Sequence, residues 1–551
     1  MRLSGLRVIP VLAGILFLGL SYLHADEVDD YIDRGISYLD QGNYDQAISD
    51  FTQAIEIDPG YAPSYYNRGL AYQKKGNYEE AIYDYTRAIA NSDDDTLSEY
   101  AYYNRGKVYI DRGNYDQAIS DYNQTIAINP YKASAYNNRG RAYYEQGNVA
   151  QAMADYTQAI AIDPNEALAH LNRAEIYLEQ KKIDQALADC TRAVDINPGD
   201  PDGYFDRGNI YYNQGNYAQA IFDYTKVIEI KPRDAQAYFF RADAYSDQKN
   251  FGQAISDYTK AIELDPNEAE FYMNRGIAYV HEGKDGLAVL DYNRAIELDP
   301  YDALAYYNRG LEYATIGKYP EAIADFTKAV DLNPHHAKSY FNRAYVYAEQ
   351  KDFDLAIADY TKAIEIDPSA NAYDGRAHTY ADQKDFNRAV VDFTKAIELD
   401  PGQAHIYAGR ANAYARQNIF DKAISDFTKA IEIDPHYKRA YFDRGDAYIK
   451  DGKFDQAISD YTKYMEFNTR DGWAYNNRGL AYHKKGNYEK AISDYTRAVE
   501  IKPDFAEAYF NRGVAYYTKL EYQMAWPDIH KAELLGYKPD AEGLEILEKI
   551  K

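Results

Sequence analysis

The chain has 551 residues, which is more than one hydrophobic core usually holds, so it must split into domains or grow by repetition. Its formal net charge of −26 argues against a nucleic-acid partner, because binding to a phosphate backbone depends on clusters of Lys and Arg. Cys190 is the only cysteine, which excludes an intramolecular disulfide and a cysteine-based metal cluster.

The N-terminus differs from everything that follows it. Arg2 and Arg7 precede an apolar run at residues 8–20, and residues 21–25 lead into an acidic stretch. This layout predicts a secretory signal peptide at residues 1–25, with an uncleaved membrane anchor as the alternative, because Leu23 and Pro10 are unusual for a cleaved signal. We therefore expect an exported protein, periplasmic or associated with the cell envelope, with the outer membrane or secretion as further destinations. Membrane contact is expected only through this segment, if it stays uncleaved.

From residue 28 onwards the sequence repeats itself. An arginine followed by Gly or Ala recurs fifteen times, and twelve of the fourteen intervals are 34 residues long. The two exceptions, of 37 and 33 residues, are expected to fall in connections between repeats. The arginines are Arg34, Arg68, Arg105, Arg139, Arg173, Arg207, Arg241, Arg275, Arg309, Arg343, Arg376, Arg410, Arg444, Arg478 and Arg512.

Offsets counted from this arginine predict a helical hairpin. Tyr occupies offset +4 in all fifteen repeats and offset −3 in fourteen, while Ala occupies +13 in all fifteen and an aromatic residue +17 in thirteen. Spacings of three and four place these residues on one face of each of two helices. Gly between the helices and Pro after the second predict where each helix ends. Small residues let the helices approach, and aromatic rings fill the space that remains.

This pattern resembles the tetratricopeptide repeat family, over about residues 28–539. The resemblance implies an all-α, right-handed superhelical solenoid of about fifteen hairpins. It also implies that first helices line a concave groove in which protein segments bind. Residues 540–551 read as one more amphipathic helix, which would cap the end of the solenoid.

Each repeat also carries an Asp sixteen residues after its arginine. We expect the two residues to form a structural ion pair, as in Arg241 with Asp257 and Arg275 with Asp291. The sequence leaves open whether Arg241 pairs with Asp257 of its own repeat or with Asp223 of the preceding one.

A search for catalytic or metal-binding residues yields none. The pair His335-His336 follows a proline in an expected turn, and Cys190 occupies an aromatic core position, where a buried inert thiol is expected. Asp93, Asp94 and Asp95 lack the ligand spacing of a calcium loop. We therefore expect no enzyme, no cofactor and no metal.

A ladder of mostly aromatic residues at offset −2 is the candidate ligand site, because the resemblance places offsets −2, +2 and +5 in the groove. Packing between neighbouring first helices is an equally good interpretation. Asn at offset −1, present in nine repeats, is expected to be framework. The ladder consists of Tyr66, Tyr103, Phe205, Phe239, Met273, Tyr307, Phe341, Phe442 and Phe510.

The leading functional hypothesis is a non-enzymatic interaction scaffold that binds proteins or peptide segments of an envelope or secretion assembly. The alternative is a polysaccharide-binding or export factor, in which the aromatic ladder stacks against sugar rings.

Overall fold

The computed structural model describes residues 27–538, and this range consists of helices and turns without a strand. The expected signal peptide or anchor at residues 1–25 and the expected capping helix at residues 540–551 lie outside the described residues. Within the described range, no helix is both long and apolar enough to cross a bilayer.

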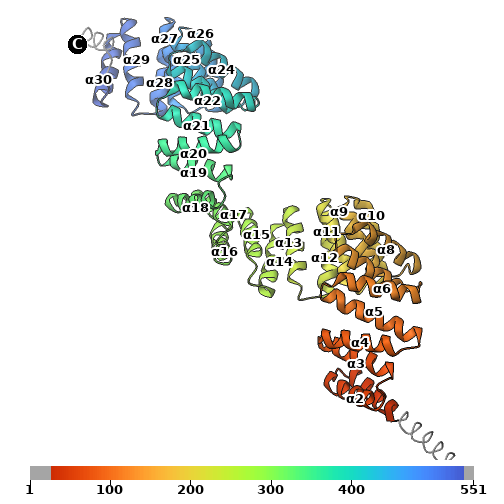
Figure 1. The fold of residues 1–551 in the computed structure, drawn as a ribbon. Helices are drawn as coiled ribbons and strands as arrows, with labels where there is room; N and C mark the ends of the chain where they lie inside the picture. The colour runs from red at the N-terminus through yellow and green to blue at the C-terminus, as the bar shows by residue number, and fades with distance from the viewer. Residues whose placement is uncertain (1–26, 539–551) are drawn as a thin grey trace, which may run out of the picture. The chain divides into compact units, whose positions relative to one another are not determined.

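The chain divides into two compact units, of which unit 1 ends at Ala278 and unit 2 begins at Tyr279. Residues 27–40 form the first described helix of unit 1. The helices that follow are shown in Figure 1: α2 (Tyr44–Ile57), α3 (Ala62–Lys75), α4 (Tyr78–Asn91), α5 (Asp95–Asp111), α6 (Tyr115–Ile128), α7 (Ala133–Glu145), α8 (Val149–Ile162), α9 (Ala167–Glu179), α10 (Ile183–Ile196), α11 (Pro201–Asn213), α12 (Tyr217–Ile230), α13 (Ala235–Asp247) and α14 (Phe251–Leu264).

The division falls inside α15 (Ala269–His281). Unit 2 continues with α16 (Asp285–Leu298), α17 (Ala303–Thr315), α18 (Tyr319–Leu332), α19 (Ala337–Glu349), α20 (Phe353–Ile366), α21 (Ala370–Asp382), α22 (Phe386–Leu399), α23 (Ala404–Arg416), α24 (Phe420–Ile433), α25 (Lys438–Lys450), α26 (Phe454–Phe467), α27 (Gly472–Lys484), α28 (Tyr488–Ile501), α29 (Ala506–Thr518) and α30 (Tyr522–Leu534).

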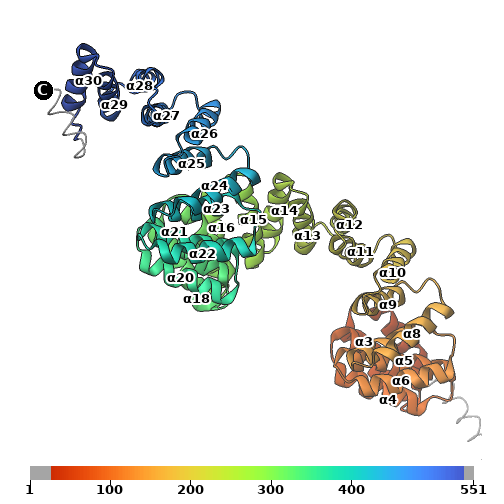
Figure 2. The ribbon, with the colours of Figure 1, turned by 90° about the horizontal axis from the view of Figure 1, so that it is seen from above.

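Within each unit the helices follow one another as hairpins. The first helix of a repeat packs on the second, the second packs on the first helix of the next repeat, and successive first helices touch, as in α3, α4 and α5. Figure 2 shows the same succession of pairs after a rotation of 90°. The predicted all-α solenoid of helical hairpins is confirmed.

Small residues on the first helix receive the aromatic ring at offset +17, as the sequence predicts. A Cβ atom built on Gly69 would lie 3.0 Å from the ring of Tyr85, and one built on Gly479 would lie 2.8 Å from Tyr495. Both rings are fully buried. Because such distances are at or below the closest approach of real Cβ atoms, glycine at offset +1 allows the two helices of the hairpin to lie this close.

Both predicted helix ends are present. Gly76, at offset +8, closes α3 with a φ of 85°, and its N–H donates to the carbonyl of Gln73. Asp163, before Pro164, ends α8 in an extended conformation. One connection differs from expectation: the longer interval between Arg68 and Arg105 mainly lengthens α5, which has 17 residues and begins after an N-cap at Asp94.

Candidate functional site

The arginine of each repeat pairs with the aspartate of its own hairpin. Arg241 Nε lies 2.7 Å from Asp257 Oδ2, and Nη2 donates to Oδ1 at 2.9 Å, which settles the choice between Asp257 and Asp223. The same two-bond geometry recurs at a separation of sixteen residues in most of the described repeats, as in Arg444 with Asp460. Such fork-to-carboxylate pairs fix orientation as well as charge.

The third nitrogen of the guanidinium, Nη1, donates a hydrogen bond to the preceding repeat, which the sequence analysis did not predict. Nη1 of Arg241 donates to Thr225 Oγ1 at 3.0 Å, and Nη1 of Arg275 donates in the same way to Thr259. Where repeat lengths vary, the partner of Arg105 is nineteen residues away and that of Arg376 fifteen. The arginine therefore links two hairpins, and both changes in repeat length fall between the threonine of one repeat and the arginine of the next.

The carboxylates of these pairs differ in acidity. Burial raises the pKa of Asp84 and Asp223 above the ordinary value, although each accepts hydrogen bonds from its arginine. Burial acts in the same direction on Asp189, but hydrogen bonds from Arg173 and His170 outweigh it, so the pKa of Asp189 is lowered. His170 replaces the usual Tyr at offset −3 and lies 2.9 Å from Asp189 Oδ1.

The predicted ladder at offset −2 is partly a packing element. Phe239 is 3% exposed, and its ring lies 5.9 Å from that of Tyr258, the offset +17 ring of its own repeat. Met273, Phe442 and Phe510 are also buried, which leaves them little surface for a ligand. The other members of the ladder, which are half-buried, remain candidates: Tyr66, Tyr103, Phe205, Tyr307 and Phe341.

Asparagines at offset −1 tie neighbouring repeats together, as expected for framework residues. Asn138 donates to the hydroxyl of Tyr103 at 3.0 Å, one repeat earlier. Where offset −2 is phenylalanine and has no hydroxyl, the asparagine bonds instead to an aspartate at offset +2, as Asn274 does with Asp243 at 3.0 Å.

Three overlapping hollows lie along the first helices of unit 2, and together we call them the groove of unit 2. The α25–α27 hollow has a volume of about 570 Å³, the α23–α25 hollow about 400 Å³ and the α21–α23 hollow about 600 Å³. Neighbouring hollows share lining residues, Arg439 and Lys450 in one case and Asn412 and Arg416 in the other. The hollows therefore lie next to one another along the first helices.

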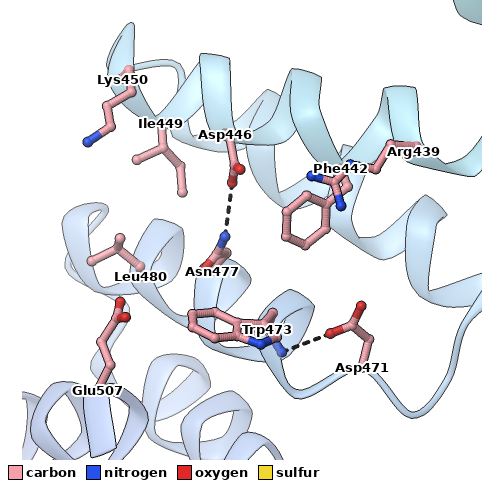
Figure 3. Close-up of a pocket in the computed structure, with 10 residues that line it drawn as sticks. All are labelled: Arg439, Phe442, Asp446, Ile449, Lys450, Asp471, Trp473, Asn477, Leu480 and Glu507. Carbon is pink, nitrogen blue, oxygen red and sulfur yellow. Dashed lines mark hydrogen bonds between the residues drawn. The ribbon is translucent and has the colours of Figure 1, made fainter. Parts of the chain in front are cut away.

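The α25–α27 hollow combines apolar and charged side chains (Figure 3). Asp446 accepts hydrogen bonds from Tyr461 at 2.5 Å and from Asn477 at 2.9 Å. Asp471 caps α27 by accepting from the N–H of Trp473. Glu507, at the α29 side, lies within 3.4 Å of Asn476 Nδ2. The carboxylates that line this hollow are thus already engaged by donors of the protein.

The α23–α25 hollow differs in the charges it leaves free. Two carboxylates line it: Asp446, and Asp443, which accepts from Arg439 at 2.9 Å and from Asn412. Arg416 and Lys450 are exposed, and no acidic side chain of the described residues forms an ion pair with either. The sequence analysis missed both residues. They share offset +6 in consecutive repeats, and the basic character of that offset here was the available signal.

The α21–α23 hollow opens where the ladder is interrupted. Asp374 and Ala408 occupy offset −2 there, followed by glycines at offset −1. Burial raises the pKa of Asp374, and the nearest imidazole nitrogens are those of His378 at 3.6 Å and His405 at 3.8 Å. These distances exceed hydrogen-bond length, and no group of described residues has the arrangement of a metal site.

Residues examined for chemistry lie in structural positions. Burial raises the pKa of the Cys190 thiol to about 12, which disfavours the reactive thiolate. His336 precedes α19, where its ring contacts Ser339 Oγ at 2.6 Å, and burial lowers its pKa.

Family models for tetratricopeptide repeats match the chain almost from end to end of the described range. Models described as "Tetratricopeptide repeat" match residues 62–95, 103–167, 139–201, 173–244, 241–303, 307–371, 370–403, 404–437 and 427–459. A model described as "TPR repeat" matches residues 35–76, 445–486 and 479–519. The chain belongs to the tetratricopeptide repeat family. No curated protein sequence matches it.

Several solved structures show partial similarity to the chain. The "APC/C hetero-tetramer Cut9-Hcn1" is 17% identical, with 90% of this chain and 98% of that chain covered and a TM-score of 0.36. YrrB, described as "a TPR protein with an unusual peptide-binding site", is 23% identical over 33% of this chain and 95% of its own, with a TM-score of 0.31. MamA is 30% identical over 29% and 94%, with a TM-score of 0.28.

Proposed function

We propose that this tetratricopeptide repeat protein is a non-enzymatic scaffold outside the cytoplasm, which holds a protein segment of an envelope or secretion assembly in the groove of unit 2. The groove carries the proposal, because three neighbouring hollows cross α21, α23, α25 and α27 and so offer a path for an extended chain. The apparent signal at residues 1–25 supports the location.

The walls of the groove suit a peptide better than a flat ligand. Ile449 and Leu480, with the edge of the largely buried Phe442, provide apolar surface at the α25–α27 hollow, beside polar groups held by hydrogen bonds within the protein. Ligand sites in proteins typically combine an apolar lining with a few oriented polar groups.

A polysaccharide is the second candidate, favoured by Trp473, which is 47% exposed and lines the α25–α27 hollow. Its ring contacts Phe505 at a centroid distance of 4.2 Å, and Lys502 Nζ lies 5.1 Å from its centroid. These contacts cover part of the Trp473 ring face on which a sugar would have to stack. We therefore favour a protein segment over a polysaccharide.

Site-specific photo-crosslinking in cells tests the proposal. A photoreactive amino acid in place of Trp473 should capture discrete protein partners, whereas one in place of Leu290, an exposed residue of the second helix α16, should not. Equal capture at both positions, or none at Trp473, would contradict a binding groove in unit 2. A reporter fused after residue 538 should be active only outside the cytoplasm.

A further inference from the structure

The α23–α25 hollow has a charge opposite in sign to that of the chain, because three cations, Arg416, Arg439 and Lys450, line it with only two carboxylates, Asp443 and Asp446. Asp443, Asp446, Asp471 and Glu507 have hydrogen-bond donors within the protein. The cations that line the α23–α25 hollow beyond Arg439 are Arg416 and Lys450, and both are exposed without an ion-pair partner among the described residues. A chain of net charge −26 thus presents a small net positive charge at this hollow.

We infer that the α23–α25 hollow binds an acidic protein segment, with Arg416 and Lys450 each pairing with one of its carboxylates. The inference rests on the proposed function and adds the chemistry of the partner. Complementary charge favours such a segment and disfavours a basic one, because a like charge placed in the hollow would meet two cations.

The placement of the two cations also predicts the spacing of the carboxylates. Arg416 and Lys450 occupy the same offset on α23 and α25, which touch each other. Helices in contact have axes about 8–10 Å apart. A segment in the polyproline II conformation returns to the same face every three residues, after about 9 Å. The segment should therefore carry its two acidic residues at positions i and i+3.

The neighbouring hollow indicates what flanks the acidic pair. Lys450 also lines the α25–α27 hollow, where Ile449, Leu480 and the edge of Phe442 offer apolar surface. A segment that continues from α25 towards α27 would place an apolar side chain there. In the α23–α25 hollow, the side-chain amide of Asn412 can hydrogen-bond to the backbone of the bound segment.

Fluorescence polarisation with designed peptides tests the inference on the full chain. The probe is a labelled twelve-residue peptide rich in Pro and Ala, with Glu at positions i and i+3 and one Leu beyond. Peptides with Gln at both positions, with Lys at both, and with adjacent Glu residues serve for comparison. We expect the i, i+3 Glu peptide to bind about tenfold more tightly than the Gln peptide, with the difference reduced by added salt.

Two double variants locate the binding. Arg416→Ala with Lys450→Ala should abolish the preference for Glu, and Arg416→Glu with Lys450→Glu should transfer it to the Lys peptide. Lys328→Ala with Lys531→Ala removes two exposed lysines from the second helices α18 and α30, and should change nothing. Circular dichroism of each variant verifies folding.

Several outcomes would overturn the inference. These are equal binding of the Gln and Glu peptides, no binding of either, or binding that survives both groove variants. Binding of polygalacturonate that depends on Arg416 and Lys450, without peptide binding, would replace the protein segment by an acidic glycan. Protein crosslinks at Trp473 without any Glu preference would leave the proposed function standing and reject the acidic partner alone.

Discussion

The first helices near α13 in unit 1 and near α23 in unit 2 are built on the same repeat but present different surfaces. In unit 1 the ring of Phe239 contacts Phe240 and Phe271, which closes the surface with aromatic side chains. In unit 2 the equivalent of Phe239 is Ala408, followed by Gly409, and a hollow opens beside them. Offsets −2 and −1 are therefore free to vary between packing and an open site.

Charge separates the two units in the same way. Residues 27–278 carry 41 acidic and 23 basic side chains, whereas residues 279–538 carry 41 and 34. At offset +6, unit 1 has Glu145, Glu179 and Asp247 where unit 2 has Arg416, Lys450 and Lys484. The framework of arginine, aspartate and small residues is shared, so binding chemistry can change along the chain without a change of fold.

The largest expected effect tests whether the framework is equivalent in both units. Asp257→Ala and Asp460→Ala each leave a guanidinium that is 14–16% exposed without its carboxylate. We expect each to destabilise its hairpin by about 3–5 kcal/mol, as found for a broken buried pair. Hydrogen exchange of the affected helices measures this locally, which suits a repeat array that need not unfold in one step.

The first repeat provides the control for this prediction. Arg34 is 54% exposed, because no described repeat precedes it, so Asp50→Ala should destabilise its hairpin much less than Asp257→Ala does. Equal losses for Asp50 and Asp257 would show that exposure does not decide the strength of the pair.

A second, smaller effect concerns the ladder itself. Phe239→Ser removes a buried ring from the side of Tyr258 and should cost about 3–4 kcal/mol, whereas Ala408→Ser in unit 2 should cost less than about 1 kcal/mol. Extending the change to Phe205 and Phe341, whose rings contact Tyr224 and Tyr360, should lower the melting temperature further. A triple variant that melts with the parent chain would assign these residues to ligand binding alone.

The sequence predicted the hairpins because the features that define them are local. Spacing of three and four, glycine at offset +8 and proline after the second helix act within one repeat. The partner of Arg241 could not be chosen, because Asp257 and Asp223 lie at similar distances along the sequence. Thr225 was missed because its hydroxyl also bonds to its own helix, at the carbonyl of Ile221, which is the ordinary role of a helical threonine.

The groove could be predicted only in part, since side-chain direction depends on what neighbouring repeats supply. Phe239 turns towards Tyr258 and is buried, which selects packing from the two interpretations, groove or packing, that the sequence left open for its offset. Arg416 and Lys450 become a pair only when α23 lies beside α25, which sequence distance does not show. The sequence shows their shared offset, and the packing of the helices shows the hollow that they line together.

A third prediction uses the acidic character of unit 1. Burial and the nearby acidic residues Asp202 and Glu175 raise the pKa of Asp206 to about 6. A raised pKa means that the folded state binds the proton more tightly than the unfolded state, so stability falls as the pH rises from about 4 to 6. Asp206→Asn should therefore stabilise unit 1 by about 2 kcal/mol at pH 7 and have little effect at pH 3.5.

Chemical unfolding at both pH values measures this difference. Asp382→Asn, at an exposed residue of the α21–α23 hollow, is the matched change in unit 2 and should alter stability by less than about 0.5 kcal/mol. A gain for Asp206→Asn that is the same at pH 3.5 and pH 7 would rule out titration as its cause.

The smallest effect sharpens what the shared framework requires at the turn inside each hairpin. Offset +8 has a positive φ in every repeat, and it is glycine in nine of them, but Leu520 takes this conformation in the last hairpin with a φ of 65°. A left-handed conformation costs a residue with a side chain about 1–2 kcal/mol. Replacement by glycine removes this cost, but part of the stabilisation is lost because glycine gives the unfolded chain more conformational entropy. Because Leu520 is 71% exposed, Leu520→Gly loses little packing and should stabilise α29 and α30 by about 0.5–1 kcal/mol.

The reverse change is Gly486→Leu. A Cβ atom built on Gly486 has no atom within 4 Å, so this change should destabilise the preceding hairpin by a similar amount through backbone strain alone. Slower hydrogen exchange in the first variant and faster exchange in the second would confirm that backbone conformation selects glycine at this offset; unchanged exchange in both would mean that the turn tolerates any residue.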